Sequence, residues 1–312
     1  MSLHPQIQQA LKALAEANLP PLESLTPAEG RLQMETMIKA RGTVPAAIGR
    51  TEDRAIPGPA GSIPVRLYWP PSAAGKLPVV VYFHGGGHVI GNLDTHDVIC
   101  RNLCAGAEAL VLSVDYRMGP ENRFPAAVED SWAALLWIAG AAAGLGADGT
   151  RIAVTGDSAG ANLAAVVALM ARDAGGPAIR LQALIYPVAD YHLTGDSFER
   201  YATGFGMLTR GAMEWFRGHY LNGIEDARDW RASPIHAPDL AGVAPALVVT
   251  AECDVLRDDG IRYAAALRAA GVAVEEREYA GMIHGFFGLT PAIDDAVAAQ
   301  AFVCDAMKRA LS

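Results

Sequence analysis

Short apolar segments alternate with longer helical segments along most of this chain. The segment Val79-Val80-Val81-Tyr82-Phe83 is apolar at every position, which is typical of a strand buried on both faces of a sheet. Residues 64–69 alternate apolar and polar side chains, which predicts an antiparallel strand at the edge of that sheet. This pattern predicts an α/β fold with a mostly parallel central sheet of about eight strands and helices on both faces. Further strands are predicted at residues 109–114, 152–155, 181–186, 246–250 and 272–278, with helical segments such as 124–138 and 258–270 between them.

Two segments lack this strand pattern. In residues 1–45 we predict two helices, and the second opens with Thr26-Pro27-Ala28-Glu29, a capping box with proline at the first helical position. Residues 190–234 are rich in aromatic side chains and are predicted to be helical. We expect both segments to form a helical cap over a catalytic domain built from residues 46–189 and 235–312. An ordinary long helical crossover is the alternative for 190–234.

Composition and charge narrow the class of protein. The chain has 312 residues, of which 51% are hydrophobic, enough for one large core. Its net charge is −9 and it contains no basic run, so no nucleic-acid partner is expected. No secretory signal or membrane span is visible, and we expect a cytoplasmic protein without stable membrane insertion. The cysteines show neither C-x-x-C nor zinc spacing, which predicts buried free thiols, no metal and no cofactor: they are Cys100, Cys104, Cys253 and Cys304.

The pentapeptide Gly156-Asp157-Ser158-Ala159-Gly160 carries the strongest chemical signal. It matches G-x-S-x-G and lies between a β-branched segment and a helical one. A serine at such a strand-to-helix turn is held on a strained elbow, and the flanking glycines let the backbone turn. The helix that begins there directs its free N–H groups at the place where an oxyanion would form. We therefore predict that Ser158 is a nucleophile.

A second glycine-rich turn, His84-Gly85-Gly86-Gly87, follows the buried strand at 79–83. We predict that the N–H groups of Gly86 and Gly87, together with that of Ala159, form an oxyanion hole. A plain glycine-rich turn and a dinucleotide-binding loop are the alternatives. The dinucleotide fingerprint fails because Ile90 occupies its third glycine position, and no G-K-[ST] sequence exists for a phosphate-binding loop.

A nucleophilic serine requires a base, and His284 is the predicted one. It lies on a loop after the last predicted strand, in Gly281-Met282-Ile283-His284-Gly285-Phe286. His84 and His88 are rivals, but both precede the serine within the glycine-rich turn.

The base requires an orienting acid, and Asp254 is the predicted one because it follows the strand at 246–250. Glu252 lies closer to that strand, and Asp258 and Asp259 are typical of a helix N-terminus. The chain order of serine, aspartate and histidine is that of α/β-hydrolases.

In these motifs the chain resembles the hormone-sensitive-lipase-like esterases, the bacterial family IV carboxylesterases of the α/β-hydrolase fold. The motifs are His84-Gly85-Gly86-Gly87, Gly156-Asp157-Ser158-Ala159-Gly160, Asp254-Val255-Leu256-Arg257-Asp258 and His284-Gly285-Phe286. The resemblance extends from about residue 60 to the C-terminus. It implies a Ser158, Asp254 and His284 triad, oxyanion donors at Gly86, Gly87 and Ala159, an N-terminal cap, and no metal or cofactor.

The predicted activity is hydrolysis of short- to medium-chain acyl esters through an acyl-enzyme, with a small-molecule ester as substrate. The alternatives are a non-catalytic ligand-binding receptor on the same fold, or an amidase. Four side chains of the predicted cap either line the pocket or form the core of the cap: Phe205, Met207, Met213 and Trp215. The resemblance also makes the strand at 272–278 a candidate edge for a homodimer.

Overall fold

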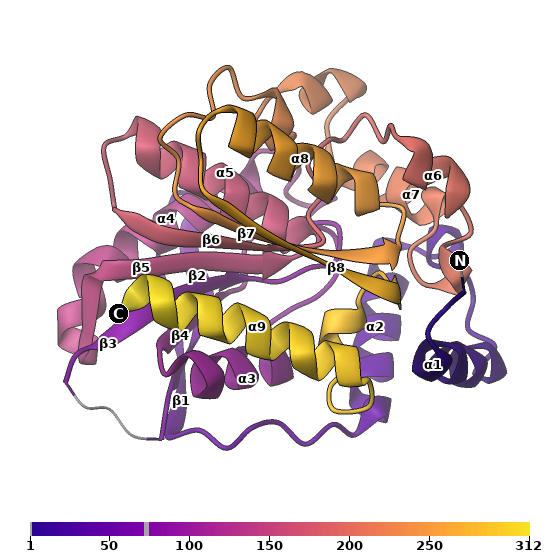
Figure 1. Cartoon of the computed structure of the whole chain (residues 1–312), viewed down its shortest axis with the longest axis horizontal. Helices are drawn as coiled ribbons and strands as arrows, with labels where there is room; N and C mark the ends of the chain where they lie inside the picture. The colour runs from indigo at the N-terminus through magenta and orange to yellow at the C-terminus, as the bar shows by residue number, and fades with distance from the viewer. Residues whose placement is uncertain (1, 72–74) are drawn as a thin grey trace.

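The computed structural model describes residues 2–71 and 75–312, and its centre is an eight-stranded sheet (Figure 1). The spatial order of the strands is β1-β2-β4-β3-β5-β6-β7-β8. The β1–β2 and β2–β4 pairs are antiparallel, and the other pairs are parallel. The predicted α/β architecture is therefore confirmed. The strands are β1 (Arg50–Gly58), β2 (Gly61–Trp69), β3 (Leu77–Phe83), β4 (Leu110–Val114), β5 (Ala147–Asp157), β6 (Ile179–Ile185), β7 (Ala246–Cys253) and β8 (Val274–Ile283).

Helices cover both faces of the sheet. In Figure 1, α3 and α9 pack together on one face, whereas α4, α5 and α8 lie on the other. The α-helices are α1 (Pro5–Glu16), α2 (Pro27–Arg41), α3 (Asp97–Ala107), α4 (Ala126–Ala141), α5 (Ala159–Asp173), α6 (Asp196–Arg200), α7 (Arg210–Tyr220), α8 (Arg257–Ala269) and α9 (Asp294–Leu311). The 3₁₀ turns are η1 (Leu22–Ser24), η2 (Ala142–Leu145), η3 (Gly204–Gly206), η4 (Ile224–Arg228), η5 (Pro234–His236) and η6 (Phe286–Gly288).

One edge of the sheet differs from the prediction. The strand predicted at 64–69 is antiparallel, as expected, but β1 pairs with it on its outer side, so it is not an edge strand. Most of the β1 side chains are exposed, and Ile56 is the buried one. Because β1 is held mainly by backbone pairing across a hairpin, it has no hydrophobic alternation from which it could be predicted. The opposite edge is β8, as expected.

The two N-terminal helices form where they were predicted. At the start of α2, Glu29 N–H donates to Thr26 Oγ1 at 3.3 Å, and Thr26 N–H donates to Glu29 Oε2 at 2.9 Å. This reciprocal pair satisfies two backbone N–H groups that the helix leaves free. The helix ends at Gly42, whose φ of 57° is the left-handed conformation that glycine adopts without a Cβ clash.

Segment 190–234 is helical in α6, η3, α7 and η4, as predicted, and it contacts the N-terminal segment. Trp215 Nε1 donates to the carbonyl of Leu25 at 3.0 Å, and Thr209 Oγ1 donates to Glu23 Oε1 at 3.0 Å. Met213 is buried. Segments nearly two hundred residues apart in the sequence therefore lie side by side.

Two further expectations concern the thiols and the membrane. All four cysteines are buried and free, as predicted. Within residues 2–71 and 75–312, no helix combines the length and the apolar character required to cross a bilayer.

Candidate active site

Ser158 occupies the sharp turn between β5 and α5. Its backbone has φ 56° and ψ −119°, a strained conformation for a residue with a Cβ atom. Both flanking glycines are required by close approach to the end of β3. A Cβ at Gly156 would lie 2.4 Å from the carbonyl oxygen of Phe83, and one at Gly160 would lie 1.9 Å from it. The predicted elbow is therefore present, with Ser158 as the N-cap of α5.

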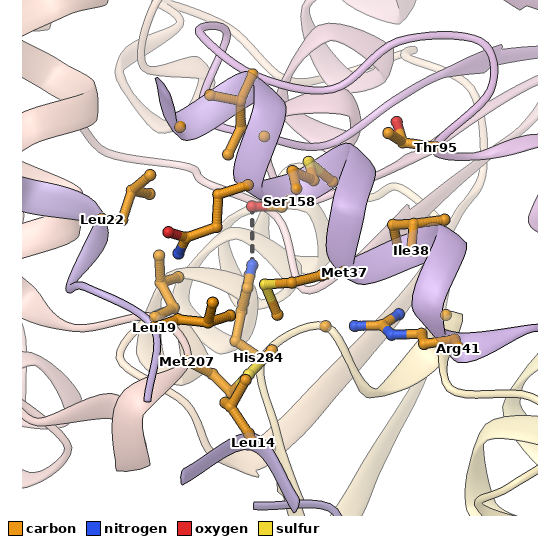
Figure 2. Close-up of a pocket in the computed structure, with 18 of the residues that line it drawn as sticks. Leu14, Leu19, Leu22, Met37, Ile38, Arg41, Thr95, Ser158, Met207 and His284 are labelled. Carbon is orange, nitrogen blue, oxygen red and sulfur yellow. Dashed lines mark hydrogen bonds between the residues drawn. The ribbon is translucent and has the colours of Figure 1, made fainter. Parts of the chain in front are cut away.

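The structure brings the three predicted reactive side chains into one chain of contacts. The Ser158 Oγ to His284 Nε2 distance is 2.9 Å (Figure 2). The His284 Nδ1 to Asp254 Oδ2 distance is 2.7 Å. The other carboxylate oxygen of Asp254 accepts the N–H of Leu256 at 3.0 Å. The ring of Tyr186 lies against the imidazole of His284, with 4.5 Å between the ring centroids. These contacts set the orientation of the imidazole toward the serine hydroxyl.

The two rival histidines have structural surroundings. His84 is fully buried and stacks on Tyr116 with 4.3 Å between centroids, and His88 stacks on Tyr220 at 4.0 Å. Burial lowers the pKa of each imidazole to about 3, which keeps both rings neutral at physiological pH. Neither ring makes the contact to the serine hydroxyl that His284 makes.

The rival acids also have other partners. Glu252 accepts the N–H of Gly281 at 2.7 Å, and Asp258 accepts the N–H of Ser197 at 2.9 Å. Asp259 accepts two backbone N–H groups just after β6, and burial raises its pKa to about 7. The carboxylate next to the imidazole is therefore the one that sequence order predicted.

The glycine-rich turn borders the same cavity. Gly86 has φ 111° and Gly87 has φ 61°, both in the region that favours glycine. A Cβ at Gly86 would lie 2.1 Å from the carbonyl oxygen of Ile90, and one at Gly87 would lie 2.2 Å from the ring of Phe216. Ala159 is buried at the first position of α5, beside the serine. Glycine is thus needed here so that the backbone can approach the cavity.

Sequence reasoning did not single out the carboxylate of Asp157. Its Oδ1 accepts the N–H of Gly85 at 3.0 Å and the hydroxyl of Tyr82 at 2.5 Å, and it lies 3.6 Å from His96 Nε2. Burial by itself would raise the pKa of this carboxyl, but the nearby His96 and Tyr82 lower it to about 2. Asp157 therefore ties the glycine-rich turn to the serine elbow. An acidic residue at the end of a buried strand was the available signal.

We expect Asp157→Asn to lower the free energy of unfolding at pH 7 by about 1–3 kcal/mol, because a charge-assisted hydrogen-bond acceptor is lost. The folded-state pKa is lower than the unfolded one, so the carboxylate stabilises the fold above pH 4. This contribution, on the order of 2 kcal/mol, is lost as the pH falls toward 2. Urea unfolding at pH 7 and pH 3 measures the gap between wild type and variant, which should shrink at pH 3. An equal gap at both values would contradict the assignment, and Asp305→Asn, which changes an exposed carboxylate, is the control.

The side chains of Ser158 and His284 line a cavity of about 760 Å³. Its walls include the glycine-rich turn, α1, η1 and α2, together with Phe205, Met207, Leu208 and Thr209. Figure 2 shows Met37 and Met207 close to Ser158 and His284. Of the four side chains that sequence analysis left open, Phe205 and Met207 line the cavity. Met213 is buried, and Trp215 bonds to the N-terminal segment.

Comparison with known proteins places this site in a family. A family described by the alpha/beta hydrolase fold matches residues 80–288. The carboxylesterase NlhH of Mycobacterium tuberculosis is 46% identical over 252 residues, which are 80% of this chain and 79% of that protein. The ethyl acetate hydrolase of Pseudomonas putida is 37% identical over 324 residues, 100% of both chains. The hyperthermophilic esterase of Pyrobaculum calidifontis has a TM-score of 0.93 and 42% identity, and the match covers 99% of each chain.

The chain therefore belongs to the α/β-hydrolase family. Within that family it is one of the hormone-sensitive-lipase-like carboxylesterases, and it is an enzyme.

Proposed function

We propose that this carboxylic-ester hydrolase works through Ser158 as nucleophile, His284 as general base and Asp254 as orienting acid. His284 Nε2 takes the hydroxyl proton while Ser158 Oγ attacks the ester carbonyl. The same imidazole then donates that proton to the leaving alcohol, which gives an acyl-enzyme. Water activated by His284 hydrolyses the acyl-enzyme and regenerates the serine.

The observation that carries this proposal is the continuous set of contacts at 2.9 and 2.7 Å, which ends on a serine that borders the cavity. Asp254 holds the proton of His284 on Nδ1, so that Nε2 is free to accept from the hydroxyl. Reaction of the serine with a fluorophosphonate probe tests the nucleophile directly, and the loss of labelling in Ser158→Ala identifies the residue.

The negative charge of the tetrahedral intermediate would be stabilised by backbone N–H groups of Gly86, Gly87 and Ala159. The close backbone approach at the two glycines and the position of Ala159 at the start of α5 support this role. Donors that are preorganised in this way stabilise the transition state without reorganisation during the reaction.

We also propose that residues 1–45 and 190–234 form a cap over a catalytic domain of residues 46–189 and 235–312. The mutual contacts of the two segments and their shared cavity wall support this division. A cavity of about 760 Å³ lined by Leu and Met side chains suits an acyl chain of limited length.

We expect p-nitrophenyl esters of short and medium acyl chains to be hydrolysed with higher kcat/KM than long-chain esters. Met37→Trp should shift the preference to shorter chains, because Met37 lines the cavity next to the catalytic histidine. Leu32→Trp is the matched control on the same helix, since Leu32 is 64% exposed and does not line the cavity. A chain-length series measures the shift, and a maximal rate on long-chain triglyceride emulsions would contradict the proposal.

Other functions receive less support. A non-catalytic receptor on this fold is not favoured, because the complete set of reactive side chains is present and the relatives are esterases. Amide hydrolysis uses the same chemistry, but the relatives named above are ester hydrolases. Pairing of two copies along β8, whose outer side has no strand partner among the described residues, stays a prediction. A cytoplasmic location of the protein also stays a prediction.

A further inference from the structure

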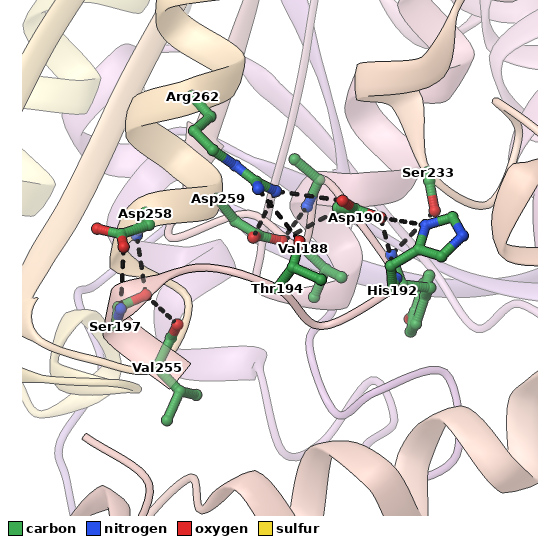
Figure 3. Close-up of polar contacts among 12 residues, drawn as sticks. Val188, Asp190, His192, Thr194, Ser197, Ser233, Val255, Asp258, Asp259 and Arg262 are labelled. Carbon is green, nitrogen blue, oxygen red and sulfur yellow. Dashed lines mark hydrogen bonds and ion pairs between the residues drawn. The ribbon is translucent and has the colours of Figure 1, made fainter. Parts of the chain in front are cut away.

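A group of metal-ligating side chains lies at the base of segment 190–234, apart from the Ser158 site. Asp190 and His192 stand where the chain leaves β6 and enters this segment, and His236 lies in η5, just after the segment ends. Figure 3 shows Asp190 between Arg262 and His192. Among the residues that the structure describes, these three form the one group of His, Cys, Asp or Glu whose ligand atoms lie close enough to hold a metal ion together.

The three ligand atoms form a compact triangle. Asp190 Oδ1 lies 2.8 Å from His192 Nδ1 and 3.2 Å from His236 Nε2, and the two nitrogens are 3.3 Å apart. A tetrahedral Zn²⁺ with bonds of about 2.0–2.1 Å places neighbouring donor atoms roughly 3.3 Å apart. The triangle therefore matches one face of a tetrahedral zinc site, with small adjustments of side chains.

When no cation is bound, three nitrogen atoms compete for hydrogen bonding to one carboxylate oxygen of Asp190. Asp190 Oδ1 faces the backbone N–H of His192 at 2.9 Å as well as both imidazole nitrogens. Each imidazole can instead carry its proton on the other ring nitrogen, which turns the inward nitrogen into a lone-pair donor. A cation in the triangle would then take the place of two inward N–H groups.

The negative charge of Asp190 and the solvent exposure of the two histidines also suit a bound cation. The carboxylate side chain of Asp190 is 7% exposed, whereas the side chains of His192 and His236 are 33% and 39% exposed. A cation can therefore reach a fixed, buried carboxylate from solvent and keep a water ligand. Asp190 Oδ2 is held by Arg262 at 3.2 Å, a contact of the kind that orients metal-binding carboxylates. Arg262 also lies 3.4 Å from Asp259, so its positive charge is shared between two carboxylates.

We propose that Asp190 Oδ1, His192 Nδ1 and His236 Nε2 bind one Zn²⁺ ion, with water as the fourth ligand. Imidazole and carboxylate donors in tetrahedral arrangement are typical of zinc. The ion would link the start and the end of segment 190–234 and so fix the base of the proposed cap. Zinc spacing rules do not detect the site, because His236 lies 44 residues after His192, beyond segment 190–234.

The test uses the full-length protein, freed of metal with a chelator and then titrated with Zn²⁺. We expect one tightly held zinc per chain by elemental analysis, and a higher Tm when zinc is in excess, because an ion that binds only the folded state stabilises it. Co²⁺ in place of zinc should give the intense visible absorption of a tetrahedral site. Both His192→Ala and His236→Ala should lose the bound metal and the Tm shift.

Two controls keep the result specific. His219→Ala removes a histidine of the same segment that is not in the triangle, and it should bind zinc like the wild type. His284→Ala should also retain the bound zinc, which separates this site from the triad. The proposal is overturned if the wild type holds no zinc after dialysis, if His236→Ala binds it equally well, or if binding is lost only in His284→Ala.

Discussion

Ser158→Ala should fold like the wild type and lose turnover by about 10⁴–10⁶-fold, measured with p-nitrophenyl butyrate. The hydroxyl is the atom that would attack the ester, and no other nucleophile stands within hydrogen-bond distance of His284 Nε2 among the residues that the structure describes. Alanine keeps the Cβ atom, so the elbow backbone and the glycine contacts around it are retained. We therefore expect the free energy of unfolding to change by less than about 1 kcal/mol.

Circular dichroism and thermal unfolding are the controls for this variant, and fluorophosphonate labelling gives an independent readout. Turnover near the wild-type level, or undiminished labelling in Ser158→Ala, would exclude Ser158 as the nucleophile. If the variant lost both its activity and its fold, its activity could not identify the nucleophile. The same experiment therefore also labels the wild type and maps the label to the peptide that contains Ser158.

Asp254→Asn should lower kcat by about 10⁴-fold, roughly 5.5 kcal/mol in the activation barrier, with little change in overall structure. The backbone N–H of Leu256 donates to Asp254 Oδ1, so an asparagine at this position would keep its oxygen there. Its amide NH₂ would then face His284 Nδ1. That contact favours the tautomer with the proton on Nε2, which cannot accept the serine hydroxyl proton.

Asp258→Asn is the matched control, because Asp258 lies four residues further along and its carboxylate accepts from Ser197 instead of facing the imidazole. It should leave kcat unchanged. If Asp258→Asn reduced kcat as strongly as Asp254→Asn did, the acid would have to be reassigned. A shift of the pH profile in Asp254→Asn, followed by kcat/KM from pH 5 to pH 10, would report the altered imidazole in a way that a purely structural defect would not.

The parts of the fold that the sequence predicted share a physical cause. Strands such as β3 are buried on both faces, so their apolar pattern is continuous, and helices such as α2 begin at a local capping box. The elbow serine and its two glycines are adjacent in the chain, because the strained turn requires them there. β1 was missed for the opposite reason: most of its side chains are exposed and its pairing is carried by the backbone.

Contacts between distant segments could not be predicted in this way. Asp157 lies in a recognised motif, yet its role depends on Gly85 and Tyr82, which come from another strand and its following turn. The cluster of Asp190, His192 and His236 forms because the two ends of segment 190–234 return to the same place. No local pattern encodes such a meeting, since it depends on how the whole segment packs.

The sequence by itself determined the fold class, the elbow serine, and the order of serine, acid and histidine, because each of these is written in local hydrophobic patterns or in short motifs. Only the tertiary structure decided that Ser158, His284 and Asp254 lie within hydrogen-bond distance, which acid faces the imidazole, and which side chains of the two helical segments enclose the cavity. The reason is that these distances join residues up to 126 positions apart, and they are set by the packing of the sheet, its helices and its covering segments.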